Sequence, residues 1–184
     1  MSNNKSNGGN VRQRFGDLEK SPLLLSEDYI KQITEHLNGD LASHFMMYFQ
    51  FKKQHWIVDG PDWKHISAAL DEYAKTILEN AEDLAEKINS LGAIPLSNPA
   101  SFPGRSYVDF EGEDKYDIRT MLENDLKLQQ STIQQLRKRI EFAKENNDHG
   151  TDDILKDVLE DNEKIAHELH HYLQEESLER SLKG

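Results

Sequence analysis

Residues 62–91, DWKHISAALDEYAKTILENAEDLAEKINSL, decide the fold. Apolar residues recur in this stretch at spacings of three and four over about eight turns, which is the pattern of an amphipathic α-helix. Asp62 can cap the helix after the break at Asp59-Gly60-Pro61, and Gly92 ends it. The stretch therefore predicts one long helix with a continuous buried face, made of Ile66, Leu70, Tyr73, Ile77, Ala81, Leu84, Ile88 and Leu91.

Three further segments show the same period. The first opens at Ser26, a suitable N-cap, and its apolar series continues to His55. Helices are also expected over about residues 116–146 and 152–176. The Pro- and Ser-rich stretch from 93 to about 113 is too long for a tight turn, so we expect a crossover with a short helix around 102–107. Two tight connections around one crossover, without strand-like alternation, predict an all-α, ferritin-like four-helix bundle.

The two ends of the chain have a different composition from the bundle. Residues 1–25 begin with a stretch rich in Asn, Gly and Ser that carries scattered basic side chains, which is typical of a flexible polar tail. A basic arm that contacts DNA or a neighbouring subunit is the less favoured interpretation. We therefore expect a tail over residues 1–25, a bundle over 26–176 and a short C-terminal tail over 177–184.

Charge and composition restrict the partners. The 184 residues have a net charge of −12, which argues against a general attraction to nucleic acid or to anionic lipid, so DNA binding is expected to be weak or absent. The chain contains no cysteine, which leaves His, Asp and Glu for any metal chemistry. Neither a membrane span nor the apolar core of a signal peptide is evident, so we expect a cytoplasmic protein, with nucleoid association as the alternative.

Four polar residues form a band beside the apolar face of the 62–91 helix, namely Ser67, Asp71, Glu82 and Glu86. Asp71 and Glu86 are 15 residues apart, or roughly 22 Å along a helix, so one helix cannot bring both to one ion. Two antiparallel copies related by a two-fold axis near Leu78 would place Asp71 opposite the partner's Glu86, with His55 at the same end. Spacing alone favours the simpler interpretation that the band is the solvated flank of an amphipathic helix.

The wider motif set resembles the Dps family of dodecameric miniferritins. It consists of His55-Trp56, the turn at Gly60, Asp71 sixteen residues after His55, Glu86 thirty-one residues after it, and the segment 84–88 before Leu91-Gly92. The resemblance covers essentially the whole chain after Ser26, including YDIR at 116–119 and HYL at 171–173. It implies a hollow shell of twelve subunits that oxidises ferrous iron at two-fold interfaces, preferably with hydrogen peroxide, and stores the ferric mineral. The alternatives are a DNA-binding shell with a degenerate or zinc-occupied site, and a purely structural bundle.

The resemblance also implies a ligand set for two irons per centre. His55, Asp71 and Glu86 match family ligands, and Glu82 stands where the family has Asp. Ser67 stands where the family has a second His, and a hydroxyl is a poor ligand at neutral pH. His65 and His167 are the candidates to replace that nitrogen, although a regular helix points His65 about 200° away from Ser67. Zinc is the main competitor of iron, because imidazole-rich sites suit it.

Two further rows of metal-ligating residues follow helical spacing. Glu160, Glu163, His167 and His171, with His170 beside them, are either a row that handles iron or an exposed acidic face, and both interpretations stay open. His36, Asp40 and His44 flank the apolar series of the first helix, and we expect them to be exposed to solvent.

Overall fold

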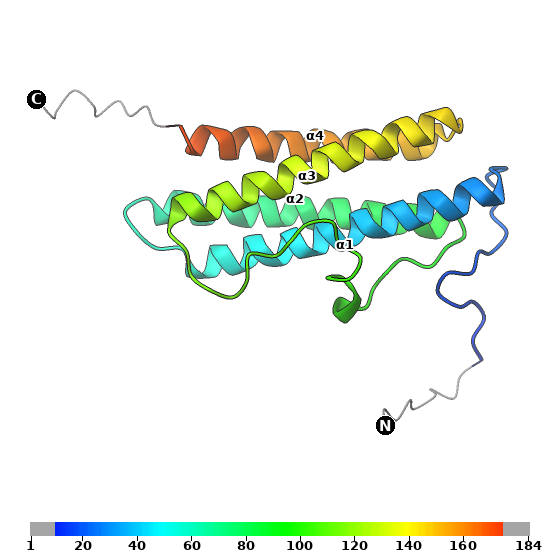
Figure 1. Cartoon of the computed structure of the whole chain (residues 1–184), viewed down its shortest axis with the longest axis horizontal. Coiled ribbons are helices and arrows are strands. Elements are labelled where there is room, and N and C mark those ends of the chain that lie inside the picture. The colour runs from blue at the N-terminus through cyan, green and yellow to red at the C-terminus, as the bar shows by residue number, and fades with distance from the viewer. Residues whose placement is uncertain (1–9, 175–184) are drawn as a thin grey trace, which may run out of the picture.

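Four long helices form the body of the protein in the computed structural model, which describes residues 10–174 (Figure 1). They are α1 (Glu27–Ile57), α2 (Trp63–Ser90), α3 (Ile118–Glu145) and α4 (His149–Tyr172), and a short 3₁₀ helix, η1 (Pro99–Ser101), lies in the crossover. Helix α1 packs mainly against α2, and α3 packs mainly against α4. The predicted all-α four-helix bundle with a long crossover is confirmed, and residues 10–174 contain no strand.

Side-chain caps mark the starts of α1, α3 and α4, whereas Asp62 occupies the predicted N-cap position of α2 without a side-chain cap hydrogen bond. The Oγ of Ser26 accepts a hydrogen bond from the amide of Tyr29 at the start of α1, as predicted. Asp148 caps α4 by accepting from the amide of Thr151 at 3.0 Å, so α4 begins at His149 and not near residue 152. The predicted short helix at 102–107 was misplaced. It lies at Pro99–Ser101, because the Asn98 side chain accepts from the Ala100 amide and Pro99 suits a first helical position.

The apolar face of α2 is buried along its whole length, as its spacing predicts. Leu70, Ile77, Leu84 and Ile88 have no solvent exposure and pack between α1 and the α3–α4 pair. The core therefore holds α2 in a fixed rotation, which leaves the opposite flank, with Asp71 and Glu86, at the surface.

The part of the N-terminal segment that the structure describes lies against the end of α2. The Glu19 amide and the Gln13 side chain both donate to the Gly92 carbonyl at 2.8 Å, and Leu18 packs against the core. Gly92 has a φ of +91°, and a Cβ there would lie 2.4 Å from the Glu19 carbonyl oxygen. Residues 1–9 and 175–184, which include the rest of the predicted N-terminal tail and the whole predicted C-terminal tail, lie outside the described residues. Helix α4 ends at Tyr172, before the predicted end near residue 176.

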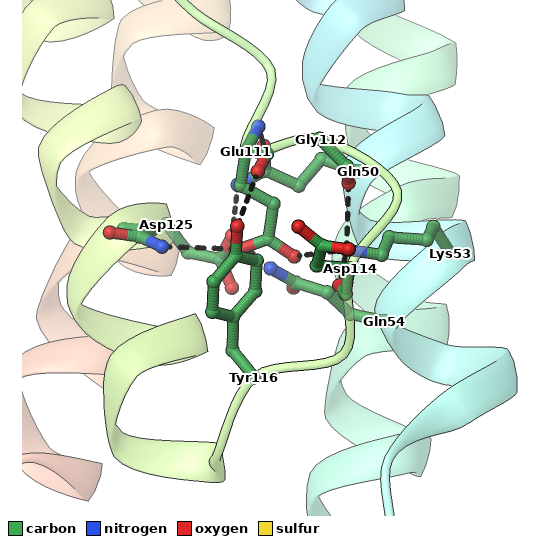
Figure 2. A network of polar contacts seen from close by, with 9 residues as sticks. Gln50, Lys53, Gln54, Glu111, Gly112, Asp114, Tyr116 and Asp125 are labelled. Carbon is green, nitrogen blue, oxygen red and sulfur yellow. Dashed lines mark hydrogen bonds and ion pairs between the residues drawn. The ribbon is translucent and has the colours of Figure 1, made fainter.

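The crossover is anchored to α1 through one lysine, as Figure 2 shows. The Nζ of Lys53 donates to the Glu111 carboxylate at 2.9 Å, to the Gly112 carbonyl at 2.8 Å and to the Asp114 carbonyl. Only 9% of the Lys53 side chain and 3% of the Glu111 side chain are exposed. The Glu111 amide also donates to Gln50, at 2.8 Å. The loop is thereby fixed to α1 two residues before His55.

No helix among residues 10–174 is both long enough and apolar enough to cross a lipid bilayer.

Candidate metal centre

His55 lies in the last turn of α1, where α2 fixes its orientation. Its Nδ1 atom is 2.8 Å from the carbonyl oxygen of Ser67 and 3.0 Å from the Ser67 hydroxyl. Because a carbonyl oxygen only accepts, Nδ1 carries the proton, and in the neutral ring the lone pair of Nε2 is left for a metal. The Ser67 hydroxyl can in turn donate to the His55 carbonyl at 3.3 Å. Ser67 therefore orients the imidazole from the position where the family pattern has a second ligand.

Asp71, one turn after Ser67 on α2, is held by two lysines. Lys52 Nζ lies 2.7 Å from Oδ1 and Lys75 Nζ lies 2.7 Å from Oδ2. The hydrogen bonds from Lys52 and Lys75 keep the pKa of Asp71 well below its usual range. The carboxylate is therefore ionised at neutral pH, as a metal ligand must be, but a cation that binds it has to displace an ammonium group.

Glu82 and Glu86 are both exposed farther along the same flank of α2. Leu78, which lies between Asp71 and Glu86, is 37% exposed, and Trp56 beside His55 is 69% exposed. Within residues 10–174 of one subunit, no three His, Asp or Glu side chains converge on a point where a metal could bind. A single chain therefore presents His55 with Asp71 at one end of the band and Glu82 with Glu86 at the other.

The two candidate replacements for the missing histidine lie elsewhere in the subunit. His65 is exposed in the first turn of α2 and lines a shallow hollow with Ile118, Leu122 and Tyr172, which belong to α3 and α4. His167 is exposed on α4, and its Nε2 lies 3.0 Å from the Nε2 of His171. Neither joins His55 and Asp71 in a three-ligand group within the described chain, so their role in the centre stays a prediction.

The expectation that the row on α1 is solvent-exposed was wrong. Asp40 and His44 are fully buried, because their side of α1 packs toward α3 and α4. His44 Nδ1 lies 2.8 Å from the Asp40 carbonyl oxygen, and its Nε2 lies 3.3 Å from the Asn162 amide nitrogen on α4. Burial raises the pKa of the Asp40 carboxyl to about 6, although Arg139 opposes the shift, and burial lowers the pKa of His44 to about 4.

A second buried acid, Asp125 on α3, has no counterpart in the sequence predictions. Its Oδ1 accepts hydrogen bonds from Gln50 at 2.7 Å and from Gln54 at 3.0 Å (Figure 2). Burial raises the pKa of Asp125 to about 8. The sequence signal for this cluster is the pair of glutamines, which lie one turn apart on α1.

Comparison with known proteins agrees with this geometry. The family profile described as the ferritin-like domain matches residues 34–178. The DNA protection during starvation protein of Halobacterium salinarum is 37% identical over 170 residues, which cover 92% of this chain and 93% of that protein. The chain belongs to the Dps branch of the ferritin-like family.

Solved structures support the same assignment to the Dps family. The crystal structure of an archaeal Dps homologue from Halobacterium salinarum superposes with a TM-score of 0.89 at 37% identity, covering 94% of this chain and 97% of that one. A Dps protein from Vibrio cholerae superposes with a TM-score of 0.80 at 22% identity, covering 86% and 99%, and shows the shared fold. That Vibrio protein is described as a member of a superfamily of ferritin-like diiron-carboxylate proteins.

Proposed function

We propose that this Dps protein oxidises ferrous iron at centres shared between two subunits and stores the ferric product inside a dodecameric shell. One observation carries the proposal: an oriented His55 at the end of α1 and an ionised Asp71 on α2 lie at one end of the exposed flank of α2, and the exposed carboxylates of Glu82 and Glu86 lie at the other. The diiron-carboxylate description of the Vibrio relative supports iron as the substrate. Leu78 on this flank and Trp56 beside His55 on α1 are exposed apolar side chains that a partner subunit would cover.

The two ends of the flank supply different parts of the site. His55 Nε2 and an Asp71 oxygen provide one half, and the partner's Glu86 provides the main carboxylate of the other half. Glu82 has the longer reach of a glutamate and serves a second, weaker iron position. Carboxylates stabilise Fe(III) more than Fe(II), so this donor set favours oxidation of the bound metal.

We assign hydrogen peroxide as the oxidant of the bound Fe(II). Two Fe(II) ions each give one electron to one peroxide molecule, and two protons complete the formation of two water molecules and two Fe(III) ions. Paired delivery of both electrons limits the release of hydroxyl radical. The protein protects its surroundings from peroxide in this scheme, and the cavity retains the Fe(III) that results.

Because Ser67 stands in place of the usual second histidine, the site lacks one nitrogen ligand. A backbone carbonyl and a hydroxyl fix His55 there, but neither supplies a metal-binding nitrogen. Of the two predicted substitutes, His65 and His167, we assign His65 from a neighbouring subunit to this role, because His167 is paired with His171 on α4. A histidine that replaces the missing nitrogen ligand would restore imidazole ligation, and zinc would then compete with iron for the site.

Oxidation after anaerobic loading tests the activity. Fe(II) is bound without oxygen, stoichiometric peroxide is added, and Fe(III) absorbance is followed against a protein-free blank. Asp71→Ala and Glu86→Ala should each slow oxidation at least about tenfold, because each removes an anionic ligand. Asp83→Ala, which removes an exposed carboxylate elsewhere on α2, is the control. Equal rates in wild type, Asp71→Ala and Glu86→Ala would exclude this site.

Co-assembly tests whether the centre is shared. A dimer of one Asp71→Ala subunit and one Glu86→Ala subunit has one intact site and one doubly defective site. Random mixing makes half of the dimers mixed, so activity should return to about a quarter of wild type. A mixture no more active than its components would show that both residues act within one subunit.

DNA binding is the second candidate function, and the name of the Halobacterium relative, DNA protection during starvation protein, favours it. The net charge of −12 opposes it, because phosphate contacts need exposed cationic side chains. A gel-shift assay in low salt decides: retardation at micromolar protein that disappears at higher salt supports DNA binding, and no retardation excludes it as a main function.

A further inference from the structure

Two histidines near the end of α4 point their ring nitrogens at each other. His167 and His171 lie one turn apart on the same exposed face, and their Nε2 atoms are 3.0 Å apart. The rings meet edge to face, with centroids separated by 4.4 Å. Neither side chain belongs to the band on α2 that carries the proposed iron site.

We propose that His167 and His171 form a separate site for one divalent transition cation of the imidazole-preferring class, with Cu²⁺ bound most tightly. Two nitrogens that each lie about 2.0–2.1 Å from one metal are about 2.9–3.4 Å apart at square or tetrahedral angles. The observed 3.0 Å falls in this range. In the metal-free pair one Nε2 donates its proton to the other, so a shift of that proton to Nδ1, with small ring rotations, lets a cation take the place of the proton between the two nitrogens. The separation of the two nitrogens thus matches that of a chelate.

The position on the helix also favours a cation. Helix α4 ends at Tyr172, so both histidines lie within its last two turns, where the helix dipole contributes partial negative charge. Glu168 adds a carboxylate nearby, since it lines a shallow hollow together with His171 and Tyr172. Its Oε2 accepts a hydrogen bond from the Tyr73 hydroxyl at 2.8 Å, which fixes this side chain against α2.

The donor set separates this site from the one on α2. It offers two imidazoles and no carboxylate ligand, since no third His, Asp or Glu converges on it within residues 10–174, and water fills the remaining coordination positions. Such a set binds Cu²⁺ in preference to Zn²⁺ or Ni²⁺, and each of these in preference to Fe²⁺. The two sites of one subunit thereby prefer different cations: the carboxylates of α2 bind iron, and the histidine pair at the end of α4 binds copper.

A neighbouring histidine supplies a matched control. His170 lies on the same turn, but its ring nitrogens lie 3.0 Å and 3.4 Å from the Gln174 side chain. Its centroid is 6.3 Å from that of His171, which is farther than the 4.4 Å within the proposed pair. His170→Gln therefore removes one imidazole from the same end of α4 and leaves the proposed chelate intact.

The test is a Cu²⁺ titration of the assembled full-length protein that carries both Asp71→Ala and Glu86→Ala, so that the α2 carboxylates do not compete. We expect one tight Cu²⁺ per subunit, with an electron paramagnetic resonance spectrum that shows two coupled nitrogens. Adding His167→Gln or His171→Gln should weaken this binding at least tenfold, and adding His170→Gln should not. Equal affinity in all four proteins, or an equal loss with His170→Gln, would overturn the proposal.

A second readout separates this site from the iron centre. In an otherwise wild-type chain, His171→Gln should oxidise Fe(II) with peroxide at the wild-type rate while it loses the tight Cu²⁺ site. A parallel loss of iron oxidation would mean that the pair serves the iron centre, and the proposal of a separate site would then be wrong.

Discussion

The Nδ1 atom of His55 lies 2.8 Å from the backbone carbonyl oxygen of Ser67, so the main chain of α2 orients the imidazole at the end of α1. A backbone acceptor persists whatever side chain occupies position 67. The orientation of His55 therefore depends on the packing of α1 against α2 more than on the serine hydroxyl.

Ser67→Ala should consequently leave iron oxidation nearly unchanged, within about threefold, because the carbonyl contact with His55 remains. Loss of the hydroxyl contacts should lower the free energy of unfolding by about 1 kcal/mol. The rate is measured with anaerobic Fe(II) and peroxide, and stability is measured by urea unfolding. His55→Ala is the comparison and should lose at least about tenfold in rate. A Ser67→Ala rate as low as that of His55→Ala would show that the hydroxyl itself serves the metal.

Lys75→Gln should tighten the binding of a divalent cation at Asp71 several-fold at low ionic strength. The substitution frees Oδ2 from an ammonium group 2.7 Å away while Lys52 keeps its contact with Oδ1. Titration with Co²⁺, followed by its visible absorption, measures the affinity. The difference from wild type should fall at high salt, because 68% of the Lys75 side chain is exposed and its charge is screened. Lys64→Gln, on the first turn of α2, is the control, and equal tightening there would indicate a general charge effect.

Asp125→Asn should change the pH dependence of stability. Burial raises the pKa of Asp125 in the native state to about 8, from an ordinary value of 3.8. The native state thus binds the proton more tightly than the unfolded state does. The contribution of this proton to the free energy of unfolding is fully present below pH 3.8 and is lost as the pH rises through about 8. The Tm of the variant minus the Tm of wild type should therefore increase as the pH rises from 4 to 8. A Tm difference that stays constant over this interval would contradict the buried, protonated Asp125.

Gly92→Ala should release the N-terminal segment from the end of α2. A methyl group at this position would lie 2.4 Å from the Glu19 carbonyl oxygen, and the φ of +91° is unfavourable for alanine. Gly112→Ala is a matched control, because Gly112 has the same φ but no atom within 4 Å of an added Cβ. Both variants should lose about 1 kcal/mol from backbone strain. Limited proteolysis within residues 10–25 should accelerate in Gly92→Ala alone, and equal cleavage in both variants would exclude the contact as the cause.

The helices could be predicted from the sequence because they depend on local spacing. All eight positions of the apolar face predicted for residues 62–91 are buried, since a 3.6-residue period fixes one face regardless of what packs on it. The start of α4 was harder to place, because Asp148 and Asp152 both suit a cap and only the fold selects Asp148. The buried Asp40 and His44 were missed because the side of α1 that meets other helices is wider than its apolar stripe.

The sequence predicted which residues could bind a metal at the candidate site, but not how their side chains are oriented. The spacing of Asp71 and Glu86 shows that one helix cannot join them, and this follows from helical rise alone. The orienting role of Ser67 depends on the approach of α1 to α2 across the Gly60 turn, which spacing does not reveal. The contact between His167 and His171 follows from their i, i+4 positions, but the distance between their nitrogens requires rotamers that only the structure supplies.

Lys53 places a positive charge among oxygen atoms of the crossover. One carboxylate oxygen and two backbone carbonyl oxygens around a positive charge are the donors with which protein loops hold Ca²⁺. In this chain the positive charge is an ammonium group covalently attached to α1. The loop therefore keeps its conformation whether divalent cations are scarce or abundant, and treatment of the protein with a chelator should leave this part of the architecture intact.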